Sequence, residues 1–285
     1  MDERRRPPRR QGLYDPMHEH DACGVGFVAN INGVASHTIV EQGLQILQNL
    51  THRGACGCDP LTGDGAGILV QVPDAFLRKV CEPLDITLPP RGEYGVGMVF
   101  LPREVNERNE CLELFERVLR DEEQRLLGWR RVPVDTTKCG DLSRSVMPEI
   151  RQLFIGRGRH TRDAAALERK LYVIRKRVER LVREAALRDS ESFYVSSLST
   201  QTLVYKGLLL PDQIPQFYHD LTDPAFASAM TWLTVDCTSA VSVLVIDWTT
   251  IGFAPPTLTL PIVTATDCRR GCAAIIPPGT FIVTG

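Results

Sequence analysis

The chain has 285 residues, and its 33 Lys and Arg residues nearly balance its 35 Asp and Glu residues, giving a formal net charge of −2. This balance does not indicate a nucleic-acid or polyanion partner, and no run of about 18 apolar residues indicates a membrane span. The length suits one large domain or two small ones with a sizeable core.

Residues 1–22 are charged, contain proline and lack apolar periodicity. Five arginines without a following apolar segment do not make a secretory signal. We expect residues 1–22 to be a leader that is removed; a disordered basic tail is the alternative for its first part. The nine cysteines are an odd number without zinc-ribbon spacing. We therefore expect free thiols, no metal and a cytoplasmic location.

Cys23 begins a segment of small residues, Cys23-Gly24-Val25-Gly26-Phe27. If the leader is removed, the Cys23 thiol lies beside a free α-amine. An α-amine has a pKa of about 7.7–8.0, so it accepts the thiol proton near neutral pH. Cys23 is thus a candidate nucleophile, and a buried structural cysteine on a strand is the alternative.

Residues 23–30 resemble a buried strand, and Asn32-Gly33 suits a two-residue hairpin turn. From Ser36 onward, apolar residues recur at intervals of three and four, which predicts an amphipathic helix up to Leu50. Residues 51–67 are rich in glycine, carry Arg53, and lead into a strand at 68–72. No Gly-Lys-Ser/Thr follows, so this is not a phosphate loop. It is either a long ordered connection or a wall of an active site beside Cys23.

The rest of the chain alternates runs of strands and helices, which indicates an α+β fold. We expect strands at 94–101 and 129–134, and a helix at 105–127 that ends at Gly128 and buries Cys111. The longest helix is expected at 160–189, with a basic face balanced by Glu168, Glu179 and Glu184. Residues 193–198 and 202–206 are expected to form a hairpin.

Several blocks resemble the amino-terminal glutaminase domain of glutamate synthases, a class II glutamine amidotransferase and N-terminal-nucleophile hydrolase. The blocks include His20-Asp21-Ala22-Cys23-Gly24-Val25-Gly26-Phe27, Leu50-Thr51-His52-Arg53-Gly54-Ala55, Thr62-Gly63-Asp64-Gly65-Ala66-Gly67 and Phe154-Ile155-Gly156-Arg157-Gly158. They stand in the family's order and at matching separations over roughly residues 12–230.

The resemblance implies a four-layer αββα sandwich, glutamine as substrate, and Cys23 as the nucleophile. It also implies a supporting role for Arg53 and Gly54, with Arg53 holding carbonyls or a carboxylate near the nucleophile. No cofactor is expected in this chain. FMN and an iron–sulfur cluster are expected in the remainder of the parent enzyme, and the synthase domain or a small subunit is the expected partner.

After Met230 the composition changes. Residues 231–285 hold 11 threonines and only five charged residues, with no Glu, Lys, His, Asn, Gln or Tyr. The family's Ser-Arg-Phe-Ser-Thr and His-Asn-Gly-Glu-Ile-Asn segments, which are expected to bind the substrate carboxylate and form the oxyanion hole, do not occur. We therefore divide the chain into a leader (1–22), an amidotransferase domain incomplete at its C-terminus (23–230) and a divergent tail (231–285).

Three functions remain open from the sequence. The first is the glutaminase activity of a glutamate synthase, and the second is hydrolysis of another amide by an N-terminal-nucleophile hydrolase. The third is an inactive fragment that acts at most as a binding or assembly piece. The ordered blocks favour the first function, and the missing downstream segments favour the third.

Overall fold

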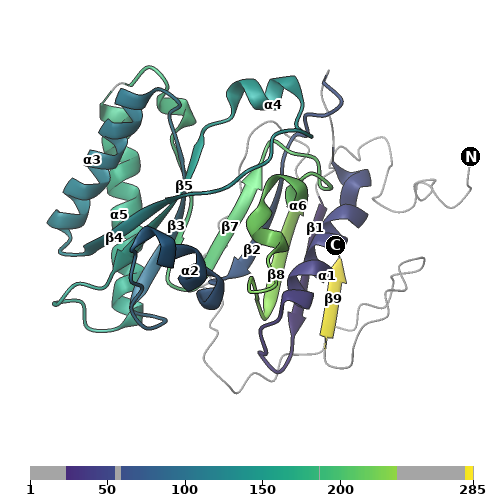
Figure 1. The fold of residues 1–285 in the computed structure, drawn as a ribbon, viewed down its shortest axis with the longest axis horizontal. Coiled ribbons are helices and arrows are strands. Elements are labelled where there is room, and N and C mark those ends of the chain that lie inside the picture. Colours follow the sequence, from purple (N-terminus) through teal and green to yellow (C-terminus); the bar gives the residue numbers. More distant parts are fainter. Residues whose placement is uncertain (1–23, 55–58, 186, 236–279, 285) are drawn as a thin grey trace, which may run out of the picture.

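The computed structural model describes residues 24–54, 59–185, 187–235 and 280–284 (Figure 1). Two antiparallel sheets lie between layers of helices, so the predicted α+β layered fold is confirmed. Among the described residues, no helix is long and apolar enough to cross a membrane.

The five-stranded sheet has the order β7-β2-β8-β1-β9. Its strands are β1 (Gly24–Asn30), β2 (Ala66–Gln71), β7 (Thr202–Gly207), β8 (Met230–Val235) and β9 (Thr280–Thr284). Strand β1 lies between β8 and β9 and pairs antiparallel with both. The strand predicted at 23–30 is therefore found over Gly24–Asn30, as an inner strand of this sheet.

The four-stranded sheet has the order β4-β5-β3-β6. Its strands are β3 (Tyr94–Leu101), β4 (Arg125–Arg131), β5 (Glu149–Gly156) and β6 (Tyr194–Ser199). Successive side chains of a strand point to opposite faces. Phe154 of β5 accordingly packs into the core shared with the five-stranded sheet, whereas Leu153 and Ile155 pack on the outer side.

Helix α1 (His37–Asn49) covers the outer face of the five-stranded sheet, and α3 (Val105–Asp121) and α5 (Ala164–Glu184) cover the outer face of the four-stranded sheet (Figure 1). The shorter helices are α2 (Asp74–Cys81), α4 (Asp141–Val146) and α6 (Ile214–Phe217). Helix α1 begins where the Ser36 hydroxyl accepts a hydrogen bond from Ile39 N, and its predicted apolar face packs on β8 and β1. Helices α3 and α5 pack on each other and on the four-stranded sheet.

Gly33 forms a turn, but the turn does not close a hairpin. Its amide donates to Asn30 O at 2.9 Å, and its φ of +69° suits glycine. The chain then enters α1, and β8 supplies the antiparallel neighbour of β1. The hairpin prediction was wrong because the partner strand comes from a distant part of the sequence.

The predicted helix at 105–127 ends at Asp121, earlier than expected. Glu123 has a left-handed φ of +57°, which turns the chain into β4. Gly128 therefore lies inside β4 and not at a helix end. A Cβ atom at Gly128 would approach Ile86 Cδ1 to 2.7 Å, so its absence permits close packing. The longest helix, α5, is also shorter than the predicted span of 160–189.

Strands β6 and β7 do not form the predicted hairpin, because they belong to different sheets. The Ser197 hydroxyl accepts a hydrogen bond from Val204 N at 3.1 Å, so a side chain replaces backbone pairing at this point. The short connection after Ser199 thus passes from one sheet to the other.

The boundary that we predicted at residue 230 falls within the five-stranded sheet. Strand β8 begins at Met230 and runs to Val235, and it pairs with both β1 and β2. Residues 231–235 therefore belong to the sheet, although the composition changes there. The rest of the predicted tail lies outside the described residues except for β9.

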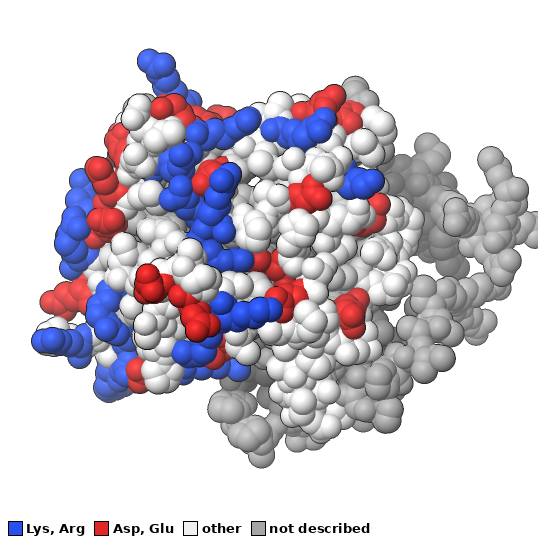
Figure 2. Space-filling view, in the orientation of Figure 1, with Lys and Arg blue, Asp and Glu red and all other residues white. Residues whose placement is uncertain are grey.

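Charged side chains gather over the α3 and α5 half of the face shown in Figure 2, and they are sparser over the half with α6. On α5, Glu179 accepts from Arg175 at 2.8 Å and Glu184 accepts from Arg180 at 2.7 Å. Glu168 instead accepts hydrogen bonds from the amide and hydroxyl of Thr200. The basic face of α5 is thus largely balanced by neighbouring carboxylates, as predicted.

Candidate active site

Strand β1 begins at Gly24, the residue directly after the predicted nucleophile. Cys23 itself lies outside the described residues, as do Cys56 and Cys58. Gly24 pairs with Val235 of β8, which pairs in turn with Ala66 of β2. Ala66 pairs with Gly207, the last residue of β7. The starts of β1 and β2 and the ends of β8 and β7 therefore lie side by side, next to the point where Cys23 joins Gly24. We call these four strand ends the site edge.

Both predicted supporting residues lie at this site edge. A short 3-10 helix, Leu50–Arg53, follows α1 and packs on β1 and β8. A Cβ atom added to Gly24 would lie 3.1 Å from Arg53 Cβ, and one added to Gly54 would lie 3.0 Å from Val235 Cγ1. The chain turns at Arg53 and Gly54, where the 3-10 helix ends, and we call this turn the Arg53–Gly54 corner. The absence of side chains at Gly24 and Gly54 allows this corner to approach the start of β1.

Arg53 is partly buried, and its backbone is fixed by neighbouring turns. Gly54 N donates to Thr51 O at 3.2 Å, and the Thr51 hydroxyl donates to Gln48 O at 2.6 Å. Within the described part of the chain, the Arg53 guanidinium has no carboxylate or carbonyl partner. Its predicted hydrogen-bonding role near Cys23 stays a prediction.

The second half of the glycine-rich segment is an ordered connection held by Asp59. One Asp59 carboxylate oxygen accepts from the Thr62 hydroxyl at 2.8 Å and from Leu142 N at 3.1 Å, and the other accepts from Leu61 N at 3.0 Å. These hydrogen bonds, with that from Thr62 the largest, keep the pKa of Asp59 below its ordinary value. Asp59 is thus a structural residue of this connection.

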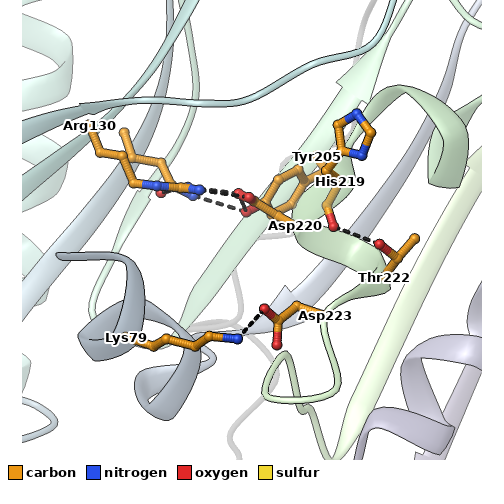
Figure 3. A network of polar contacts seen from close by, with 8 residues as sticks. Lys79, Arg130, Tyr205, His219, Asp220, Thr222 and Asp223 are labelled. Carbon is orange, nitrogen blue, oxygen red and sulfur yellow. Dashed lines mark hydrogen bonds and ion pairs between the residues drawn. The ribbon is translucent and has the colours of Figure 1, made fainter. Parts of the chain in front are cut away.

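A buried polar network links β4 and β5 of the four-stranded sheet with β7 of the five-stranded sheet and with the short helix His219–Thr222 (Figure 3). The Arg130 guanidinium donates to both oxygens of Asp220 at 2.7 Å, and the Tyr205 hydroxyl donates to Asp220 at 2.8 Å. Gln152 accepts from Arg130 at 2.7 Å and donates to the Tyr205 oxygen at 2.9 Å. All four side chains are thus partnered in a region that excludes water.

Burial alone would lower the pKa of Arg130, but the hydrogen bonds and charge of Asp220 raise it above its ordinary value. Burial, reinforced by Asp220, also raises the pKa of Tyr205. The network therefore holds a fixed ion pair and a neutral tyrosine. Sequence reasoning missed it because its members stand far apart in four separate elements.

Three other cysteines are buried and poorly suited to nucleophilic chemistry. Burial raises the pKa of Cys81 to about 11 and that of Cys111 to about 12, and it also raises the pKa of Cys139. A thiol with a pKa of about 11 or 12, as at Cys81 and Cys111, is almost fully protonated near neutral pH. Cys111 packs in the apolar core between α3 and the four-stranded sheet, as predicted. Among the described residues, no cluster of three His, Cys, Asp or Glu side chains could hold a metal ion.

Comparison with known proteins gives a match to the family described as glutamine amidotransferases class-II over residues 23–235. The match begins at Cys23 and ends with β8.

The chain is 49% identical over 222 residues to the glutamate synthase [NADPH] large chain of Bacillus subtilis, covering 78% of this chain and 14% of that protein. It is 42% identical over 236 residues to the glutamate synthase [NADH] of Saccharomyces cerevisiae, covering 78% of this chain and 10% of that protein. It is 38% identical over 223 residues to the chloroplastic ferredoxin-dependent glutamate synthase 2 of Arabidopsis thaliana, covering 78% and 13% respectively. The matched part is therefore a small fraction of each of these relatives.

Proposed function

Because the chain belongs to the class II glutamine amidotransferases, we propose that it releases ammonia from glutamine for glutamate synthesis, through Cys23. The observation that carries this proposal is the meeting of Gly24, Arg53 and Gly54 at the site edge. The family match beginning at Cys23 supports the same residue.

The proposed reaction starts with proton transfer from the Cys23 thiol to its own α-amine once residues 1–22 are removed. The thiolate attacks the side-chain amide carbon of glutamine, the C–N bond breaks, and ammonia leaves with the proton. Water then hydrolyses the glutamyl thioester to glutamate and restores the thiol. The buried thiols of Cys81, Cys111 and Cys139 do not compete, since their pKa values are raised.

Arg53 is proposed as a supporting residue and not as a reacting group. It lies beside Gly24, and its fork of donors suits carbonyl or carboxylate groups near the nucleophile. Gly54 is proposed to keep the corner close to β8, because a side chain there would meet Val235.

The relatives' names imply a larger reaction. We propose that the ammonia passes to a synthase domain or partner subunit, where flavin and an iron–sulfur cluster would supply the redox chemistry. We assign no cofactor to this chain, and we propose that it acts in the cytoplasm.

The test combines intact-mass analysis with thiol labelling of the chain expressed from its own gene. We expect a mature form that begins at Cys23 and is alkylated by a glutamine-like chloroketone. Cys23→Ala should abolish this labelling, whereas the matched Cys139→Ala variant should retain it. Labelling that persists in Cys23→Ala, or a reactive protein that keeps the leader, would contradict the proposed mechanism.

A second candidate, an inactive binding or assembly piece, is favoured by the missing His-Asn-Gly-Glu-Ile-Asn segment. Attack on an amide places negative charge on the carbonyl oxygen, and loss of one oxyanion-hole donor costs about 10²–10³ in turnover. This second function predicts little ammonia release from the 285-residue chain, and recovery when the family's downstream segment follows residue 235. Ammonia release by the 285-residue chain at the same rate as by the extended, active form would rule out the inactive-fragment function.

A further inference from the structure

Three segments that are distant in sequence meet beside the site edge. They are residues 59–63, residues 138–143 and residues 209–213, and the Gln213 carboxamide lies where they join. Its Nε2 atom donates to Leu61 O at 3.0 Å and to Lys138 O at 2.8 Å, while its Oε1 atom accepts from Leu210 N at 2.8 Å. One side chain thus binds a backbone group of each segment.

The geometry leaves the Gln213 carboxamide little freedom. Gln213 is only 3% exposed, and both of its amide hydrogens have backbone partners. Gly140 N also donates to Leu61 O at 3.0 Å, so this carbonyl receives hydrogen bonds from two segments. A Cβ atom at Gly63 would approach Leu209 O to 2.5 Å, which shows how closely the segments pack.

We call the meeting point of these three segments around Gln213 the junction. Two of its segments also border the site edge. A Cβ atom at Gly54 would lie 3.9 Å from Pro211 Cδ, so the segment that contains Leu210 also borders the Arg53–Gly54 corner. The segment that contains Leu61 leads within a few residues to Ala66, which pairs with Val235 at the site edge. A displacement of either segment would therefore move the surroundings of Gly24.

We propose that Gln213 is a positioning residue for the candidate active site, because its carboxamide fixes the wall formed by residues 59–63 and 209–213. By positioning this wall, Gln213 would also affect which substrate the site accepts, and this part of the proposal rests on the proposed glutaminase function. Gln213 touches no reacting group. It determines where the wall lies relative to Gly24 and to the Arg53–Gly54 corner.

The test compares Gln213→Leu and Gln213→Glu with Gln216→Leu in the full 285-residue chain. Glutamate retains the size of the side chain and an acceptor for Leu210 N, but removes both donors. Gln216 is a matched control on α6, since it is exposed and its amide donates only to Asp212 O at 2.9 Å. Hydrogen exchange is measured at the amides of Gly140 and Leu210, with β3 and β5 amides as internal references.

We expect both Gln213 variants to exchange about five- to thirty-fold faster at the junction, since Gln213→Glu removes two buried hydrogen bonds and Gln213→Leu removes three. The β3 and β5 amides, and all amides of Gln216→Leu, should be unchanged. Unchanged exchange at the junction in both Gln213 variants would overturn the proposal. Equal acceleration throughout the chain would also overturn it, because Gln213 would then contribute only to global stability.

The link to the site is tested by alkylation of Cys23, measured on its peptide, with a glutamine-like chloroketone and with iodoacetamide. We expect the preference for the glutamine-like reagent to fall in the Gln213 variants and to persist in Gln216→Leu. An unchanged preference together with faster exchange would show that the wall does not belong to the site. If the unsubstituted chain shows no preference, the proposed function fails, while exchange and the iodoacetamide rate still decide whether Gln213 positions the surroundings of Cys23.

Discussion

On the outer side of the four-stranded sheet, α3 and α5 are held mainly by buried apolar side chains, whereas the site edge of the five-stranded sheet borders a junction of polar contacts. The first region includes Leu153, Ile155, Leu167 and Leu171, all fully buried. The second depends on Asp59 and Gln213, which bind backbone groups of three segments.

This difference follows from how directional the two kinds of contact are. Apolar burial is roughly proportional to area and has little directionality, so it suits the broad packing of helices on a sheet. Hydrogen bonds to backbone groups have defined distances and angles. Loops near a candidate active site are accordingly positioned by side chains such as Gln213, and an amino-acid change there should alter chemistry more than stability.

The largest expected effect on stability is at the polar network that joins the two sheets. Asp220→Ala leaves the Arg130 guanidinium, 7% exposed, without its charged partner. We expect the free energy of unfolding to fall by about 3–5 kcal/mol, measured by urea denaturation.

The control for Asp220→Ala is Lys79→Ala, which removes the nearby ion pair of Lys79 with Asp223 at 2.6 Å (Figure 3). The Lys79 side chain is 60% exposed, so this change should cost no more than about 1 kcal/mol. Equal losses for the two variants would show that the buried network has no special role between the sheets.

A pair of glycine substitutions sharpens the comparison of the two regions. A Cβ atom at Gly95 in β3 would overlap Leu171 Cδ1 of α5, so we expect Gly95→Ala to cost about 1–3 kcal/mol by overpacking. A Cβ atom at Gly24 would only be tight, at 3.1 Å from Arg53 Cβ. Gly24→Ala should therefore change the alkylation rate of Cys23 more than the free energy of unfolding. The opposite result, in which Gly24→Ala loses more unfolding free energy and Gly95→Ala changes the alkylation rate more, would contradict this difference between the two regions.

The smallest expected effect is an acid-dependent loss of stability between α3 and α5. Hydrogen bonds from Lys170 and Arg177 outweigh burial and lower the pKa of Glu122 below its ordinary value of 4.5. Because the folded pKa is lower, the unfolded state binds more protons in this range, and stability rises with pH. The contribution is complete above about pH 4.5 and is lost as the pH falls through the folded pKa.

Glu122→Gln should remove this contribution, about 1 kcal/mol or less because both cations are partly exposed. Urea denaturation at several pH values should show a smaller change in stability between pH 5 and pH 3 than in the unsubstituted chain. Glu116→Gln, on the helix that Glu122 directly follows, is the control, since the contact of Glu116 with Arg120 is long, at 3.8 Å, and exposed. If the loss of stability between pH 5 and pH 3 is reduced equally in both variants, Glu122 is not the cause of that loss.

The sequence by itself determined much of the local structure and the family. The periodic apolar residues after Ser36 predicted α1, and glycine alternating with apolar residues predicted β3 with its observed bounds. The ordered motifs around Cys23 and Arg53 predicted the amidotransferase family, which the comparisons confirmed. These features depend on short-range patterns, in which neighbouring residues share one face or one turn.

Only the tertiary structure decided which distant residues meet. It placed β6 and β7 in different sheets, set residues 231–235 beside β1, and joined Arg130 to Asp220 and Gln213 to Leu61. No local pattern encodes these contacts, because partners as far apart in sequence as Gly24 and Val235 come together only when the strands pair. The sequence therefore nominated the residues of the candidate site, and the folded chain brought Arg53 and Gly54 to the start of β1 and the end of β8.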